Sequence, residues 1–251
     1  MEQRDILGFS GYVQLQEDFN IENGKLIFDA ARDKDSGIKS SFGKSKKLTP
    51  YKKTVDGLVS YSLYQTKTSN STDILKALKS SDFNDPEVKK FLIRSAIYAV
   101  RILRSMKADV IVTPISSSDL TKEFVKEIER RTNYDVLIDS FMKRPDLSKV
   151  TIDKDHPKIT DSIIKSMQRT LDKAVKSGSL SVKLFAVPHR KFLKNLFEVT
   201  DEKIYNKTQD KNVVIIDDVM TSGTTTQHIR DILITNQAES VSALTIFKST
   251  S

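Results

Sequence analysis

Several residue types and motifs are missing from this 251-residue sequence, and each absence removes a class of function. There is no cysteine, which excludes disulfide bonds, thiolate metal ligands and cysteine nucleophiles. The three histidines, His156, His189 and His228, include no pair with the spacing of a zinc site. The sequence has neither the Gly-x-Ser-x-Gly motif of serine hydrolases nor the Gly-x-x-x-x-Gly-Lys-Ser/Thr phosphate loop. No apolar run suits a signal peptide or a transmembrane helix, so we expect a cytoplasmic protein without membrane contact.

Basic residues outnumber acidic residues, and the formal net charge is +8. Such an excess attracts polyanions, among them nucleic acids and phosphorylated substrates. The lysines are spread along the chain, however, and many are expected on solvated helix faces. The charge therefore predicts weak nucleic-acid binding that disappears at physiological salt.

The most informative stretch is residues 213–226, where a strand, two acids, a hydroxyl-rich loop and a helix follow one another. Residues 213–216 are all β-branched, which is typical of a strand buried on both faces of a parallel sheet. Asp217 and Asp218 come next, at the end of that strand, where carboxylates can accept hydrogen bonds from sugar hydroxyls. The N–H groups that open the following helix, together with the hydroxyls of the loop, can bind phosphate. The run therefore predicts a pocket for a ribose 5-phosphate.

The same residues resemble the diphosphoribosyl-binding motif of the type I phosphoribosyltransferases. That motif consists of four apolar residues, two acids, two apolar residues and a Thr/Ser-Thr/Ser-Gly-x-Thr/Ser turn, and residues 213–225 fit every position. The expected strand–loop–helix order is the context that the motif requires. The resemblance implies a magnesium-dependent transferase that binds phosphoribosyl pyrophosphate and replaces its pyrophosphate with a nitrogen acceptor such as a nucleobase. The sequence is compatible with a homodimer but does not set the oligomeric state.

The resemblance also implies a role for each residue of the run. Asp217 and Asp218 would hold the ribose hydroxyls and stabilise the positive charge that develops as pyrophosphate leaves. Magnesium would be held through substrate and water, with no direct protein ligand. The alternative is a generic α/β turn with two adjacent acids. The residues implied for the 5-phosphate are Thr221, Ser222, Gly223, Thr224 and Thr225.

A second strand–turn–helix unit is predicted earlier, with a buried strand at residues 109–113 and a helix at residues 120–131. In the resembled family, the loop after an earlier core strand binds the pyrophosphate of the substrate. That loop often contains glycine or a basic residue, and this one has neither. A simple Asp or Ser N-cap is the alternative. The positions that match the pyrophosphate loop are Ser116, Ser117 and Ser118.

Residues 188–199 are basic and end in Asn-x-Phe-x-Val, which resembles a stretch of the competence-type members of the family. The resemblance implies that Arg190 and Lys194, with Lys191 between them, meet pyrophosphate oxygens. A basic amphipathic connector is the alternative, since Lys and Arg are ordinary in loops.

The order of the expected elements predicts a type I phosphoribosyltransferase-like α/β fold, a parallel sheet flanked by helices with a hood subdomain. Residues 57–251 would form this core, and residues 143–190 interrupt the strand–helix alternation as the hood that chooses the acceptor. Residues 1–56 are expected to form a hairpin, with its turn at Asn23-Gly24, and a lysine-rich loop at residues 31–54.

Two other functions fit the same residues. One is a non-catalytic regulator that senses phosphoribosyl pyrophosphate and binds nucleic acid through a basic surface. The other is an enzyme that modifies a base within a polynucleotide. The motif favours a transferase of nucleotide metabolism, and the sequence does not identify the acceptor.

Overall fold

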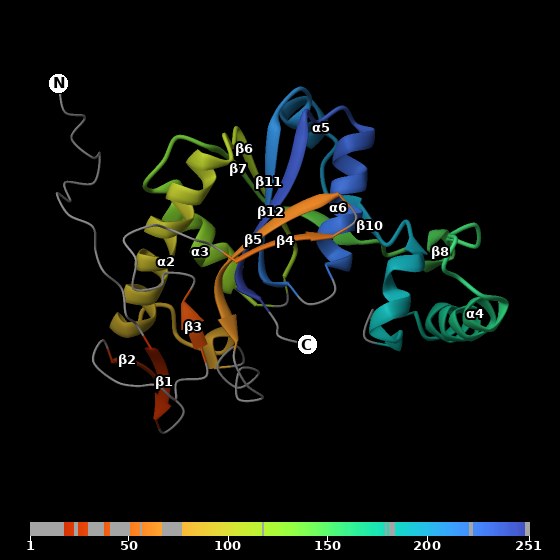
Figure 1. Ribbon diagram of the computed structural model, residues 1–251, viewed down its shortest axis with the longest axis horizontal. Coiled ribbons are helices and arrows are strands. Elements are labelled where there is room, and N and C mark those ends of the chain that lie inside the picture. Colours follow the sequence, from red (N-terminus) through yellow and green to blue (C-terminus); the bar gives the residue numbers. More distant parts are fainter. Residues whose placement is uncertain are drawn as a thin grey trace.

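A mostly parallel β-sheet lies at the centre of the computed structural model, with helices on both faces (Figure 1). The predicted α/β fold class is therefore confirmed. No helix in the described part of the chain is both long and apolar enough to cross a membrane. The structure describes residues 18–22, 25–29, 38–40, 51–55, 57–66, 77–116, 118–178, 180, 184–220 and 223–248.

The central sheet has the strand order β10-β7-β6-β11-β12-β5-β3, and β4 also pairs with β5. The strands β7, β6, β11, β12 and β5 run parallel, whereas β10, β3 and β4 pair antiparallel at the two sides. The bounds are β3 Ile38–Ser40, β4 Tyr51–Val55, β5 Leu58–Thr66, β6 Val110–Pro114, β7 Asp135–Lys143, β10 Phe197–Val199, β11 Asn212–Met220 and β12 Ser240–Lys248.

The helices divide between the two faces of the sheet. Buried side chains of α2 and α3 pack against one face, and those of α6 pack against the other. The helix bounds are α2 Pro86–Ser105, α3 Leu120–Glu129, α4 Asp161–Ser177, α5 Lys203–Thr208 and α6 Thr224–Thr235.

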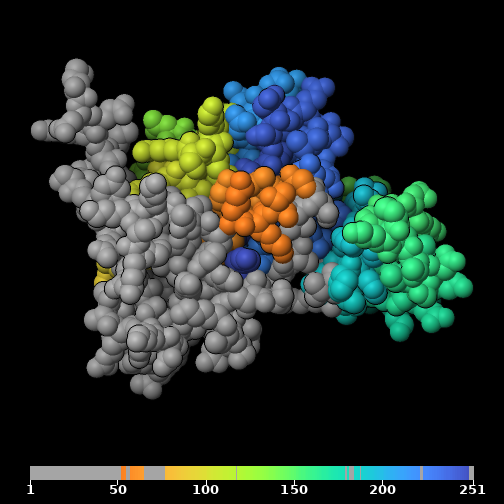
Figure 2. All heavy atoms as spheres, in the orientation of Figure 1, coloured from red at the N-terminus to blue at the C-terminus, as the bar shows by residue number. Residues whose placement is uncertain are grey.

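Residues 143–196, from the last residue of β7 to the residue before β10, are called here the hood segment and contain α4. A short antiparallel pair, β8 Thr151–Ile152 and β9 Leu193–Lys194, joins its two ends. It also contains two 3-10 helices, η1 Leu147–Lys149 and η3 Val187–Phe192. The hood segment forms a lobe beside the sheet, green to teal at the right of Figure 2. The buried hydrophobic residues of the hood segment belong to the same cluster as those of α6.

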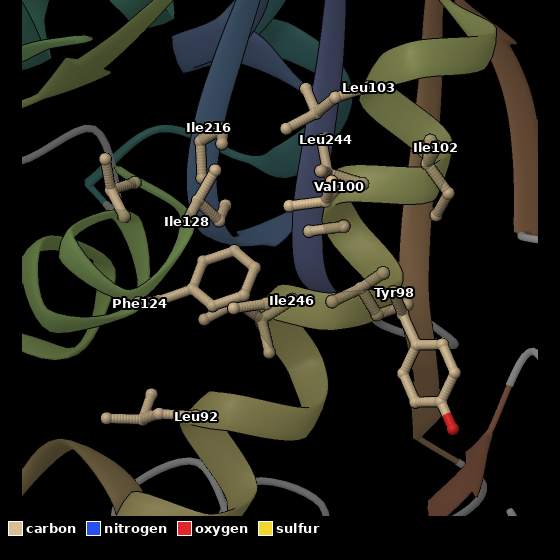
Figure 3. Packing of buried hydrophobic residues seen from close by; sticks show 14 of the residues in the cluster. Leu92, Tyr98, Val100, Ile102, Leu103, Phe124, Ile128, Ile216, Leu244 and Ile246 are labelled. Carbon is tan, nitrogen blue, oxygen red and sulfur yellow. The ribbon is translucent and has the colours of Figure 1, made fainter. Parts of the chain in front are cut away.

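The predicted strand at residues 213–216 is confirmed as the beginning of β11, with every side chain at most 1% exposed. Alternate residues face opposite sides, as the strand period requires. Val214 and Ile216 pack with α2 and α3, whereas Val213 and Ile215 pack with α6 and the hood segment. Figure 3 shows Ile216 beside Leu244 of β12 on the α2–α3 side.

The sheet has a topological switch point between its neighbouring strands β6 and β11. From β6 the chain passes through α3 to β7, and from β11 it passes through α6 to β12 on the other side. Since the two helices cover opposite faces, their N-termini diverge from a crevice at the carboxyl ends of β6 and β11. Open α/β sheets bind ligands in such crevices.

Before β5 the described residues form β1 and β2, in the part of the chain where a hairpin was predicted, and β3 and β4, in or next to the predicted loop. β1 Asp18–Glu22 and β2 Lys25–Asp29 form an antiparallel hairpin whose Glu22–Lys25 pair flanks residues 23–24. β3 lies within residues 31–54, which had been expected to be a loop, and β4 begins there and ends at Val55. Both strands pair with β5. The partner of β3 is remote in sequence, whereas β4 precedes β5 directly and its Val55–Leu58 pair flanks residues 56–57. The rest of that loop lies outside the described residues.

Asp85→Ala is expected to destabilise the protein by about 1 kcal/mol, because Asp85 is the N-cap of α2. Its carboxylate accepts hydrogen bonds from the N–H groups of Glu87 at 2.9 Å and Val88 at 3.4 Å. Denaturant unfolding measures the loss. Asp85→Asn is the control, because asparagine also caps well, and a similar loss in both variants would contradict the cap.

Candidate functional site

Asp217 and Asp218 lie near the end of β11, at the switch-point crevice. Strand alternation directs Asp217 to the α6 side and Asp218 to the α2 side. The N–H of Asp218 donates to Oδ1 of Asp217 at 2.8 Å, which holds the first carboxylate against the backbone. Asp218 is 7% exposed, and Asp217 is partly buried. Two carboxylates at the end of a buried strand form the acidic part of the site.

Lys79 is the cation of the acid pair, and sequence reasoning missed it. Its Nζ forms an ion pair with Oδ2 of Asp218. Burial, followed by the nearby Asp218 carboxylate, raises the pKa of Asp217 to about 7. The hydrogen bond from Asp218 N–H and the charge of Lys79 oppose this rise in the pKa. Lys79 therefore offsets part of the cost of holding two carboxylates together.

The N-terminus of α6 follows the acid pair directly. Its N-cap is Gly223, which supplies no side-chain cap and has a φ of +77° that favours glycine. The N–H groups of a first helical turn have no intrahelical partner, and in α6 they include those of Thr225 and Thr226. They are donors for an anion. Gly223, Thr224 and Thr225 are thus at the helix opening, whereas Thr221 and Ser222 lie outside the described residues.

The loop after β6 meets the same crevice. Ser118 N–H donates to Ser116 Oγ at 3.3 Å, and Ser117 lies outside the described residues. The simple N-cap alternative is not observed, because the N-cap residue of α3, Asp119, makes no side-chain cap bond. Within the described part of the chain, the buried hydroxyls of Ser118 and Thr121 have no hydrogen-bond partner. The opening of α3 therefore has unused polar groups, unlike the capped opening of α2.

A cleft of about 520 Å³ lies between the turn before α2 and the opening of α3. Lys79 and Ser118 both line it, so the cation of the acid pair and a predicted pyrophosphate residue share one cavity. Phe83 supplies an apolar part of the wall, and the other lining residues are polar. The remaining lining residues are Ser80, Ser81, Asp82, Asn84, Asp119 and Glu123.

The predicted basic residues 190, 191 and 194 lie in the hood segment and engage local partners. Arg190 Nε donates to the carbonyl oxygen of Phe185 at 3.0 Å. Lys191 Nζ lies 5.1 Å from the ring centroid of Phe192. Lys194 Nζ lies 3.2 Å from Oδ2 of Asp153. No contact in the described structure joins them to Ser116 or Ser118, so the two predicted pyrophosphate groups are not brought into contact.

Lys194 nevertheless lies close to α6. Burial lowers the pKa of His228 in α6 to about 4, and the charge of Lys194 adds to the lowering. The His228 ring is also 6.2 Å from that of Phe197. His228 is partly buried, with Phe197 of β10 and Lys194 of the hood segment beside that part of α6.

A third carboxylate, Asp139, lies near the loop after β6. β7 has a bulge, in which residues 138–140 lie opposite the single residue Thr113 of β6. Asp139, in the middle of the bulge, has a φ of +54°. Asp139 N–H donates to Thr113 Oγ1 at 2.8 Å, and its carboxylate lies 3.4 Å from Lys122 Nζ in α3. Bulges often re-aim side chains near functional sites. Within the described residues, no cluster of three or more His, Asp or Glu side chains could hold a metal ion.

No protein-family model and no curated protein sequence matches the chain. Among solved structures, a hypoxanthine-guanine phosphoribosyltransferase from Bacillus anthracis is 13% identical, with a TM-score of 0.37 over 62% of this chain and 66% of that chain. A hypoxanthine phosphoribosyltransferase from Staphylococcus aureus is 12% identical, with a TM-score of 0.34 over 62% of each chain. This chain thus spans less than two thirds of either. Both are phosphoribosyltransferases, the family that residues 213–225 resemble.

Proposed function

We propose that the protein is a magnesium-dependent phosphoribosyltransferase. It would transfer ribose 5-phosphate from phosphoribosyl pyrophosphate to a nitrogen acceptor such as a nucleobase and release pyrophosphate. The observation that carries the proposal is the junction of β11 and α6, where two carboxylates precede a helix whose N-cap residue, Gly223, has no side chain to cap it. In the proposal, the carboxylates bind a diol and the adjacent helix opening binds a phosphate, as a ribose 5-phosphate requires.

Two helix openings at one crevice suit a substrate with phosphate groups at both ends. In the proposal, the first turn of α6 and residues 221–225 bind the 5-phosphate. The opening of α3, with residues 116–118, binds the pyrophosphate. The cleft beside Ser118 supplies space for that second group. Arg190 and Lys194 would join it from the hood segment after a local rearrangement, since both now have partners there.

In the proposed reaction, the bond between C1 and the pyrophosphate oxygen breaks, and a nitrogen of the acceptor bonds to C1. Positive charge develops on the ribose as the leaving group departs. Asp217 and Asp218 accept hydrogen bonds from the ribose hydroxyls and stabilise that charge electrostatically. The 5-phosphate site fixes the position of C1 relative to the two carboxylates.

Magnesium would neutralise the leaving pyrophosphate when it is bound. It prefers oxygen ligands and keeps several waters, often with only one or two protein carboxylates nearby. The carboxylates of Asp217 and Asp218 would fit that preference and would hold the metal through substrate and water.

The proposal also covers the organisation of the chain. Residues 57–251 would be the catalytic core, and residues 143–190 the hood that chooses the acceptor. Residues 1–56 would be an N-terminal addition. The enzyme would act in nucleotide metabolism in the cytoplasm.

The test is incubation with phosphoribosyl pyrophosphate, magnesium and a panel of free nucleobases, with pyrophosphate release and product mass measured together. We expect release that depends on one class of base and yields its ribonucleotide. Removal of magnesium by a chelator should abolish the release. The Lys90→Met variant should release pyrophosphate like the wild type, because Lys90 lies on α2 in an exposed pair with Glu87, 3.9 Å apart. No turnover with any base, together with no calorimetric binding of phosphoribosyl pyrophosphate, would refute the proposal.

A further inference from the structure

The positive charge of the protein is concentrated in the hood segment. Residues 143–196 contain 13 Lys and Arg but only 5 Asp and Glu, a net charge of +8. The whole chain contains 41 basic and 33 acidic residues, so 28 of each sign remain outside the segment. The rest of the chain is therefore neutral overall, although basic residues are spread along all of it. The excess of positive charge therefore has to be explained by the residues of the hood segment itself.

Some cations of the hood segment hold the segment together. Arg144 Nη1 lies 2.8 Å from Oε2 of Glu198, and Lys149 Nζ lies 3.7 Å from Oδ2 of Asp146. Lys194 pairs with Asp153. These pairs use basic residues near the base of the lobe and leave those of α4 to be explained.

Four cations of α4 form a stripe on its exposed side. Lys165, Arg169, Lys173 and Lys176 are all exposed, and none has an ion pair within the part of the chain that the structure describes. At ~100° per residue they fall within an arc of ~80° on one side of the helix. The stripe runs for ~16 Å along the axis, at 1.5 Å per residue.

The opposite side of α4 anchors it to the protein. Met167, Leu171 and Ala174 are at most 5% exposed, and the first two belong to the hydrophobic cluster beneath. Thr160 caps the start of the helix, and Gly178 ends it with a φ of +66°. The helix is thus fixed by its apolar face, and its cations are exposed to solvent. α4 lies in the lobe at the right of Figure 1.

We propose that the exposed stripe of α4 is a binding surface for the phosphate backbone of a polynucleotide. Four cations over ~16 Å exceed what a single diphosphate group can meet, whereas duplex DNA carries a charge every ~1.7 Å of its axis. A membrane surface is less suitable, because an interfacial helix inserts its apolar face, and that of α4 is buried in the protein. Asp161 and Asp172 lie beside the stripe and limit the positive surface on one side. Asp172 accepts a hydrogen bond from Gln168 at 2.9 Å.

The proposal predicts how binding depends on salt. For a single strand, each phosphate contact makes the slope of log K against log salt more negative by about 0.7, so the affinity falls more steeply as salt is added. Four contacts predict a loss of about 50-fold between about 50 and 200 mM salt. After neutralisation of three cations, the remaining contact predicts a loss of only about 3-fold over that range.

The test uses the full chain and end-labelled single-stranded DNA and RNA, with affinity measured by fluorescence anisotropy across this salt range. The variant is Lys165→Gln with Arg169→Gln and Lys173→Gln. The matched control removes three exposed cations outside the hood segment, Lys89, Lys203 and Lys207, also to Gln. Both triple variants should keep the unfolding temperature of the wild type, because all six side chains are exposed.

We expect the α4 variant to lose most of its affinity at low salt and about two units of the salt slope, and the control variant to keep both. An equal loss in the two variants would show that net charge alone attracts the ligand and would overturn the proposal. The same holds if the α4 variant binds like the wild type. Binding to vesicles of phosphatidylserine without binding to either oligonucleotide would assign the stripe to membranes instead.

Discussion

Asp218→Asn is expected to lower kcat/KM for phosphoribosyl pyrophosphate by about 10²- to 10³-fold. An amide keeps the shape of the side chain but supplies no negative charge opposite the positive charge that develops on the ribose. It also loses the ion pair with Lys79. Asp217→Asn should act in the same direction, because in the proposed reaction both carboxylates bind the same ribose. Initial rates of pyrophosphate release measure both effects.

The pH dependence of its unfolding temperature shows whether Asp217→Asn loses activity without losing its fold. The folded protein raises the pKa of Asp217 from 3.8 to about 7, so the carboxyl contributes most to stability when it is protonated. That contribution is present below the unfolded pKa and is lost as the pH rises through the folded pKa. Asparagine has no such loss. The unfolding temperature of Asp217→Asn should therefore rise relative to the wild type between pH 4 and pH 8.

A loss of activity together with a relative gain of stability indicates a residue kept for function at a cost to the fold. If both folded variants retain full turnover and full affinity for phosphoribosyl pyrophosphate, the acid pair has no part in the reaction. If Asp217→Asn loses stability equally at all pH values, the carboxylate is structural.

The parts of the fold that were predictable are those whose pattern is local. Residues 213–216 form a strand because an all-β-branched run satisfies burial on both faces, whichever neighbours it has. The helix at residues 120–129 follows from its own apolar stripe. By contrast, β3 exists through its pairing with a remote part of the chain, and nothing in its own residues indicates it. The pairing of β4 with β5 had a local signal that was missed, since residues 56–57 between the paired Val55 and Leu58 are Asp-Gly, a sequence typical of hairpin turns.

The site shows the same division. The junction of β11 and α6 was predictable because acids, loop and helix are consecutive in the chain. Lys79 was not, since its partner Asp218 is remote in sequence and one lysine among many carries no signal of its own. The bulge at Asp139 depends on a hydroxyl of the neighbouring strand, Thr113. The exposure of His228 depends on how the hood segment packs on α6. Each missed feature is a long-range contact.

Lys79→Met is expected to lower kcat/KM by about 10²-fold, because Lys79 positions the carboxylate of Asp218 and offsets the charge of the acid pair. Its removal also takes away a charge that lowers the pKa of Asp217, so that pKa should rise. If the ionised pair is the active form, the acid limb of the kcat/KM profile moves to higher pH. Rates of pyrophosphate release from about pH 5.5 to 8.5 measure the shift, since the pKa of Asp217 lies within that window.

Lys79→Arg retains the positive charge and should restore the acid limb to its wild-type position, even where the longer side chain leaves the rate low. Lys90→Met removes a lysine from an exposed pair and should change neither rate nor profile, because exposed pairs contribute little. A lower rate in Lys79→Met with an unshifted acid limb would mean that Lys79 only supports the turn before α2. If Lys79→Arg reverses the shift of the acid limb seen in Lys79→Met, the shift comes from the lost positive charge. A change in packing would not be reversed by restoring the charge on a side chain of different shape. That result would establish Lys79 as the electrostatic partner of the acid pair.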